Sequence, residues 1–175
     1  VPGVWVESSG GVSGANIQVR GIPAAGDAPL VTIAINGAPI FGAPSLSFFE
    51  SSTVFRLDET IGGVEALRGG PNPVFASGQN GLTVNFRLKK GNDDIDNKIK
   101  YTVSDFGLNR IDAVFGGELG NDLYYMVGGY VSSSPGLRDS QFTSERGKQF
   151  TVNLTKEFDK GEVSVFTRTT DDTGA

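Results

Sequence analysis

The 175-residue chain contains no cysteine and no histidine. It therefore has no disulfide, no thiolate nucleophile, no imidazole base and none of the usual side chains that bind zinc or iron. These absences exclude most catalytic designs. We expect a protein that is not an enzyme and that carries no cofactor and no metal site of its own.

Positive charge and long apolar runs are also scarce. The 15 Lys and Arg residues are outnumbered by 20 Asp and Glu residues, which gives a net charge of −5. Nucleic-acid binding needs clustered Lys and Arg, so no nucleic-acid partner is expected. No stretch approaches the roughly 20 apolar residues of a membrane helix. If the chain crosses a membrane, we expect it to do so with strands.

Glycine is abundant, with 25 residues, and only 38% of the chain is hydrophobic. This composition favours short strands and turns, and hence a mainly β fold. Residues 61–90 predict a strand at 64–67, a Gly/Pro-rich loop and a second strand at 82–88. Arg68 stands where the first of these strands meets the loop.

The amino-terminal part alternates short strands with loops. Strands are expected at residues 17–19 and 30–35, and Asn36-Gly37 is a strong hairpin signal before residues 38–40. Residues 41–58 have a looser pattern, in which we expect one or two helical turns.

Beyond a polar connector at residues 91–97, the sequence alternates apolar and polar residues along five predicted strands. Tight turns are expected at residues 120–122 and 159–161, and a long polar loop at 132–148. Antiparallel strands with alternating short and long connections are typical of a membrane β-barrel. The same alternation also fits a soluble β-sandwich that binds carbohydrate or another ligand.

These alternatives differ in where one set of residues lies. A barrel exposes the set to lipid, whereas a sandwich buries it against a second sheet. The set is Ile99, Tyr101, Ile111, Phe115, Leu123, Tyr125, Val127, Phe150, Val152 and Leu154. A third and remote alternative, an acid/base hydrolase, requires two facing carboxylates among Glu118, Asp122, Asp139 and Glu145.

Four motifs follow one another in the first 70 residues: Val1-Pro2-Gly3-Val4, Ile17-Gln18-Val19-Arg20-Gly21, Ile33-Ala34-Ile35-Asn36-Gly37-Ala38-Pro39 and Val64-Glu65-Ala66-Leu67-Arg68-Gly69. In this order and spacing they resemble the plug domain of TonB-dependent outer-membrane receptors. The resemblance implies an α+β plug of short mixed strands with one or two short helices at residues 1–90. Antiparallel meander strands of an incomplete transmembrane β-barrel would follow at residues 91–175.

The resemblance also implies a function. Receptors of this family sit in the outer membrane of Gram-negative bacteria and import a scarce nutrient, such as a ferric siderophore, a cobalamin-like molecule or a carbohydrate. TonB supplies the energy, acting through a segment expected upstream of Val1. The expected partners are therefore TonB, a small-molecule or metal-chelate substrate and outer-membrane lipid. Five strands do not close a 22-stranded barrel, so the chain is expected to be a fragment. The sequence does not identify the substrate.

Two groups of site residues follow from the resemblance. Three plug loops are expected to face the substrate; their candidate residues are Glu7, Ser8, Ser9, Ala24, Asp27, Phe41, Ser45, Phe48 and Phe49. Arg20 and Arg68 are expected to lock the plug by pairing with glutamates of the barrel wall, because a buried arginine is costly without a carboxylate. The alternative is that both are solvated turn residues.

Overall fold

The computed structural model describes residues 3–8, 15–19, 31–40, 55–68, 81–92, 95, 97–105, 107–136, 143 and 145–174. Strands are the only regular elements in these ranges, and no helix occurs in them. The chain divides into two compact units. The first comprises Val1–Arg56 and Gly63–Arg87, and the second comprises Leu57–Gly62 and Leu88–Ala175.

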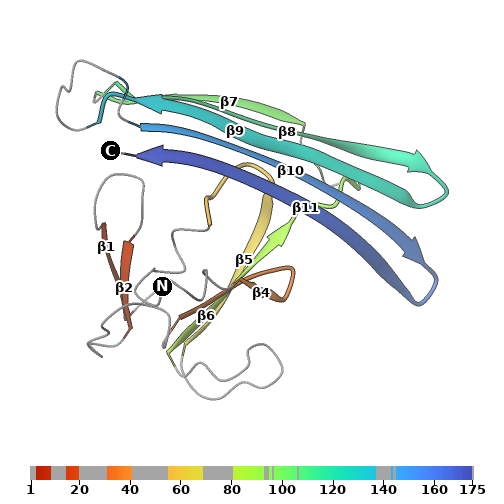
Figure 1. Cartoon of the computed structure of the whole chain (residues 1–175). Helices are drawn as coiled ribbons and strands as arrows, with labels where there is room; N and C mark the ends of the chain where they lie inside the picture. The colour runs from red at the N-terminus through yellow and green to blue at the C-terminus, as the bar shows by residue number, and fades with distance from the viewer. Residues whose placement is uncertain are drawn as a thin grey trace. The chain divides into compact units, whose positions relative to one another are not determined.

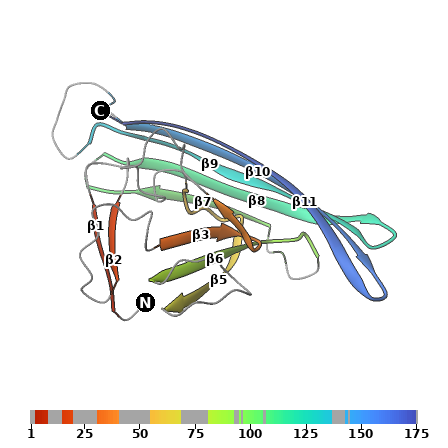
Figure 2. The same ribbon diagram turned by 60° about the horizontal axis from the view of Figure 1, so that its bottom comes forward.

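The first unit contains two sheets (Figures 1 and 2). One pairs β1 (Val4–Ser8) with β2 (Ala15–Val19) in antiparallel fashion. The other has the strand order β4-β3-β6-β5; its strands are β3 (Val31–Ile35), β4 (Ala38–Ile40), β5 (Ile61–Arg68) and β6 (Leu82–Leu88). Within it, β3 is antiparallel to β4 and parallel to β6. The strands expected at 64–67 and 82–88 are confirmed as parts of β5 and β6, which are neighbours in this sheet.

The core of the four-stranded sheet is apolar. Every residue of β3 is buried, as expected for a central strand that is covered on both faces. Phe86 of β6 stacks on Phe55 with ring centroids 4.1 Å apart. The hairpin predicted at Asn36-Gly37 is also confirmed, and both residues have positive φ (48° and 82°), as a type I′ turn requires.

The helical turns expected within residues 41–58 fall mainly outside the described residues. Residues 55–58, the described end of this stretch, are not helical. They lead directly into the turn that precedes β5.

The second unit contains a five-stranded antiparallel sheet with the order β11-β10-β9-β8-β7, here called the wall sheet. Its strands are β7 (Lys98–Val103), β8 (Asn109–Gly120), β9 (Leu123–Ser134), β10 (Glu145–Phe158) and β11 (Gly161–Gly174). Tight turns join β8 to β9 and β10 to β11 at one end of the sheet, and the longer connection between β9 and β10 lies at the other (Figure 1). The predicted alternation of short and long connections is confirmed.

Two strand ends differ from the prediction. The loop expected over residues 132–148 is shorter, because Ser132 pairs with Gly147 and Ser134 pairs with Glu145. Strand β11 continues beyond its last apolar residue, Phe166, through a polar stretch to Gly174. In both places backbone pairing with a neighbouring strand extends the sheet through residues whose side chains carry no apolar alternation.

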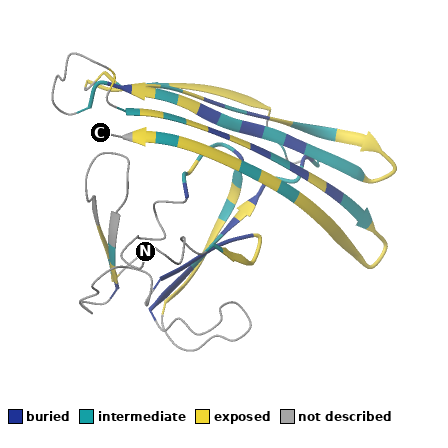
Figure 3. Cartoon of the chain, in the orientation of Figure 1, coloured by how far each residue is buried: buried dark blue, intermediate teal, exposed yellow. Residues whose placement is uncertain are grey.

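Buried and exposed residues alternate along the strands of the wall sheet (Figure 3), and the polarity of its two faces is inverted relative to a soluble core. Its buried face is rich in polar side chains: Asp112, Gln149, Thr151, Asn153 and Thr155 are all at most 4% exposed. Of the ten residues expected to face outward, six are classed as exposed, from Ile99 at 69% to Phe115 and Leu154 at 43%. Leu123, Tyr125, Val127 and Val152 are half-buried. None is buried as a sandwich requires.

Candidate functional site

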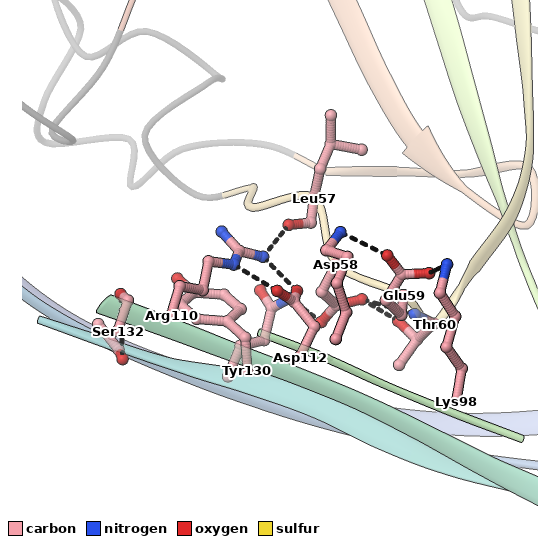
Figure 4. Close-up of polar contacts among 12 residues, drawn as sticks. Leu57, Asp58, Glu59, Thr60, Lys98, Arg110, Asp112, Tyr130 and Ser132 are labelled. Carbon is pink, nitrogen blue, oxygen red and sulfur yellow. Dashed lines mark hydrogen bonds and ion pairs between the residues drawn. The ribbon is translucent and has the colours of Figure 1, made fainter. Parts of the chain in front are cut away.

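A short segment that leads into β5 and includes its first two residues lies on the polar face of the wall sheet. This segment, Leu57–Gly62, is here called the strap (Figure 4). Its contacts reach all five strands of the wall sheet. The first is a hydrogen bond from Arg110 of β8, whose Nη2 donates to the carbonyl oxygen of Leu57 at 2.6 Å.

Asp58 makes the most buried contacts of the strap. Its carboxylate accepts a hydrogen bond from Gln149 Nε2 of β10 at 2.5 Å, and Arg168 Nη2 of β11 lies 3.4 Å from its other oxygen. The Asp58 side chain is fully buried, and that of Arg168 is 9% exposed. The same carboxylate also accepts from the backbone N–H and the hydroxyl of Thr60. Losing one partner of such a buried pair typically costs about 3–5 kcal/mol.

Glu59 makes a second, more open set of contacts. Lys98 and Lys100 of β7 donate to its two carboxylate oxygens at 3.0 and 2.5 Å. These hydrogen bonds, that from Lys100 first, hold the pKa of the Glu59 carboxyl below its usual value of 4.5. Both lysine side chains are almost half exposed, so solvent and salt screen the pairs.

Thr60 completes the strap's contacts with the wall sheet. It is fully buried, and its methyl group packs over Gly128 of β9. A Cβ added at Gly128 would lie 2.8 Å from this methyl carbon and 2.5 Å from the carbonyl oxygen of Ala113. Glycine at position 128 therefore allows the strap to approach the sheet closely.

A second segment of the chain, residues 88–92, follows the strap along the same face. The backbone N–H of Lys89 donates to the carbonyl oxygen of Thr60 at 2.9 Å, and Asn153 Nδ2 donates to the Lys89 carbonyl at 3.0 Å. Gly91 then approaches the backbone of Tyr125 so closely that an added Cβ would lie 1.8 Å from its carbonyl oxygen. Gly91 also has a φ of 95°, so no other residue fits easily here.

A polar cluster on the wall sheet adjoins the strap. Arg110 pairs with Asp112 through two hydrogen bonds of 2.8 and 2.6 Å, and its guanidinium lies 4.0 Å from the ring centroid of Tyr130. The Tyr130 hydroxyl donates to Asp172 at 2.8 Å. The fully buried Asp112 is thus bound by a two-pronged arginine contact, the strongest geometry for such a pair.

The distribution of charge is simple. The strap supplies carboxylates, from Asp58 and Glu59, and the wall sheet supplies the cations that meet them. This arrangement holds a segment of the chain in place on the sheet. Among the described residues, no group of three or more Asp, Glu, His or Cys side chains is placed to hold a metal ion.

The predicted site residues are mostly beyond what the structure describes. Ser9, Arg20, Ala24, Asp27, Phe41, Ser45, Phe48 and Phe49 lie outside the described residues. Glu7 and Ser8 end β1, but only their backbone is described. Arg68 is the last residue of β5 and is exposed. The substrate-facing and locking roles of these residues stay predictions.

The sequence reading missed the strap. Asp58 ends the stretch in which one or two helical turns were expected, Glu59 follows it directly, and Arg168 lies beyond the last apolar residue of its strand. Asp58 and Arg168 are 110 positions apart, so no local spacing connects them. One signal was present: two neighbouring carboxylates, Asp58 and Glu59, stand a few residues before the strand predicted at 64–67.

In the ranges that the structure describes, no helix has the length and apolar character needed to cross a membrane.

Comparison with known proteins identifies the fold. No protein-family model matches the chain, and no curated protein matches it by sequence. Solved structures do match, and they share the fold of TonB-dependent outer-membrane receptors.

Three of these structures illustrate the likeness. The ferric yersiniabactin uptake receptor FyuA of Yersinia pestis superposes with a TM-score of 0.73 at 20% identity, over 96% of this chain and 27% of its own. The pyoverdine outer membrane receptor FpvA of Pseudomonas aeruginosa PAO1 superposes with a TM-score of 0.73 at 16% identity, over 98% of this chain and 24% of its own. The copper transporter OprC superposes with a TM-score of 0.69 at 17% identity, over 98% of this chain and 26% of its own. The chain thus spans about a quarter of the length of these proteins.

Proposed function

We propose that this chain forms the plug and the first wall strands of an outer-membrane receptor of a Gram-negative bacterium. Residues 1–90 would be the plug and residues 91–175 the opening strands of the barrel. The observation that carries the proposal is the inverted polarity of the wall sheet, whose exposed face is apolar and whose buried face is polar. Lipid outside and a filled polar lumen inside account for both faces.

The soluble β-sandwich is the weaker account. A sandwich places its apolar face against a second sheet and its polar face in water. The wall sheet exposes Ile99, Tyr101 and Phe150 by more than half while Asn153 is fully buried. Water is a poor solvent for the first three and would readily solvate the last, so an aqueous setting fits neither face.

Lipid contact is tested by fluorescence quenching. The chain has one tryptophan, so Trp5→Phe leaves a background into which one probe is introduced. In vesicles containing brominated lipid, the Trp5→Phe/Phe150→Trp variant should be strongly quenched. The matched Trp5→Phe/Tyr130→Trp variant, whose probe replaces a buried residue of the opposite face, should not. Equal quenching of the two probes would refute the membrane placement.

For the cargo and the energy source, we propose uptake of a scarce nutrient driven by TonB. The candidates are a ferric siderophore, a cobalamin-like molecule and a carbohydrate. FyuA, FpvA and OprC are named for a ferric siderophore, a pyoverdine and copper, which favours a metal chelate. The test is uptake of each labelled candidate by cells that express the full-length protein. Accumulation should disappear when TonB is deleted, while surface binding remains.

Arg20 and Arg68 are proposed to lock the plug, and the three plug loops to face the substrate. No catalytic role is proposed for any residue. The strap contacts support the idea that charge pairs hold chain segments to the polar face, since Asp58 and Glu59 do so on this sheet. An Arg68→Ala variant that transports and leaks no differently from the wild type would argue against the locking role.

A further inference from the structure

Two donors of the wall sheet converge on the Asp58 carboxylate. Gln149 of β10 donates to one oxygen at 2.5 Å, and the guanidinium of Arg168 of β11 lies 3.4 Å from the other. Gln149 is 4% exposed, and the Arg168 side chain is 9% exposed. Both of these donors belong to the wall sheet, whereas the strap supplies the anion and two further donors, the backbone N–H and the hydroxyl of Thr60.

The donors are oriented by the sheet itself. The Thr170 hydroxyl donates to Gln149 Oε1 at 2.9 Å, which directs the amide nitrogen of Gln149 toward Asp58. Arg168 lies opposite Thr151 in the ladder between β10 and β11, and Gln149 lies opposite Thr170. The two donors therefore come from one regular ladder, from pairs separated by the single pair of Phe150 and Thr169.

The charged groups nearby are already engaged. Arg110 binds Asp112, and the hydroxyl of Tyr130 binds Asp172. Asp112 neutralises Arg110, so the guanidinium of Arg168 is left to meet the Asp58 carboxylate. One guanidinium is balanced by a singly charged anion.

We propose that the wall sheet carries a binding site for a singly charged carboxylate ligand, and that Asp58 fills this site from within the chain. Removal of the strap carboxylate takes away the anion that lies 3.4 Å from Arg168, and another carboxylate of the same size restores this buried contact. While the strap is docked, Asp58 competes as a tethered ligand at high effective concentration. The site rests on the contacts between the strap and the wall sheet, and it does not depend on the proposed transport role.

Chemical rescue tests the site. The Asp58→Ala variant of the full chain removes the anion and leaves space for the smallest carboxylate, formate. Thermal unfolding is measured at pH 7 while formate replaces chloride at constant ionic strength. The Tm of the Asp58→Ala variant should rise with formate and reach a plateau, whereas that of the wild type should not respond beyond the general salt effect.

Three controls separate a site from a general anion effect. Glu59→Ala removes the neighbouring carboxylate, but its lysine partners are solvated, so no saturable response to formate is expected. Asp58→Asn fills the space with an amide and should lose stability without rescue. Adding Gln149→Leu to Asp58→Ala removes one donor and should weaken or abolish the rescue.

Each outcome decides the proposal. If Asp58→Ala folds in formate but not in chloride, the site is supported. The proposal is overturned if Asp58→Ala responds no more than Glu59→Ala, or if it fails to fold in both salts. Because lipid quenching at Phe150 is measured separately, loss of the carboxylate site would leave the proposed membrane placement standing, and the reverse also holds.

Discussion

The four-stranded sheet of the first unit and the wall sheet of the second follow opposite burial rules. In β3 and β6 the buried residues are largely apolar, such as Ile33 and Phe86. In β10 the buried residues are Gln149, Thr151, Asn153 and Thr155, while Phe150 is exposed between the first two. A strand in which polar and apolar residues alternate therefore indicates only that its two faces have different surroundings. Which face is buried depends on what surrounds each sheet.

The largest expected effect comes from replacing one phenylalanine of each sheet with alanine. Phe86→Ala should cost about 3–5 kcal/mol, because it removes a buried ring that stacks on Phe55 and leaves a cavity. Phe150→Ala should cost less, because detergent or lipid chains refill the space. Hydrogen exchange at the amides of β3 and β10 measures both losses. Equal losses of stability in the two variants would contradict the distinction between a packed protein core and an apolar face covered by lipid or detergent.

Charge placed on the exposed face of the wall sheet should give the next largest effect. Phe150→Arg lies near the middle of β10 and should cost about 2–4 kcal/mol in a bilayer. Phe158→Arg puts the same charge on the same face at the end of the strand, where the cost should fall to about 0–1 kcal/mol. Urea titration of folding into lipid vesicles compares the two variants. A cost that does not depend on position along the strand would contradict membrane burial.

The smallest effect is expected at Glu59. Its carboxyl has a lowered pKa, so it stabilises docking of the strap above pH about 4.5, and this contribution is lost as the pH falls through the lowered value. Glu59→Gln should cost less than about 1 kcal/mol at neutral pH, since its lysine partners are exposed. It should also flatten the pH dependence in that acidic range. Hydrogen exchange at the Thr60 amide between pH 3 and pH 6, corrected for intrinsic rates, gives the comparison.

The double variant Lys98→Met/Lys100→Met is the matched control for this prediction. It should flatten the pH profile as Glu59→Gln does, because it removes the cause of the lowered pKa. Were the profile of the double variant to keep the wild-type slope, the acid response would have to originate elsewhere.

Much of the fold is readable from local sequence. The five wall strands, the Asn36-Gly37 turn and the two tight turns of the wall sheet all depend on residues close together in the chain. The polar stretch after Phe166 was not assigned to a strand, because pairing with β10 rather than side-chain alternation keeps it in the sheet. In such regions the length of a strand depends on the neighbouring strand that it pairs with as much as on its own sequence.

The site was less predictable for a related reason. The partners of Asp58 are Gln149 and Arg168. They lie on strands far away in the sequence, and no rule of local spacing connects them to Asp58. The inverted polarity of the wall sheet also could not be decided by alternation alone, since a barrel and a sandwich share it. The motif around Arg68 was recognisable by resemblance, and its role remains a prediction.

The separation of 110 positions between Asp58 and Arg168 has a kinetic consequence. The buried ion pair cannot form until β11 has been synthesised and paired, and closing so long a loop is entropically costly. Until then the strap is held only by its contacts with the earlier strands, such as those of Leu57 with Arg110 and of Glu59 with Lys98. Full docking of the strap should therefore follow the pairing of β11, and protection of the Thr60 amide would report that β11 has joined the sheet.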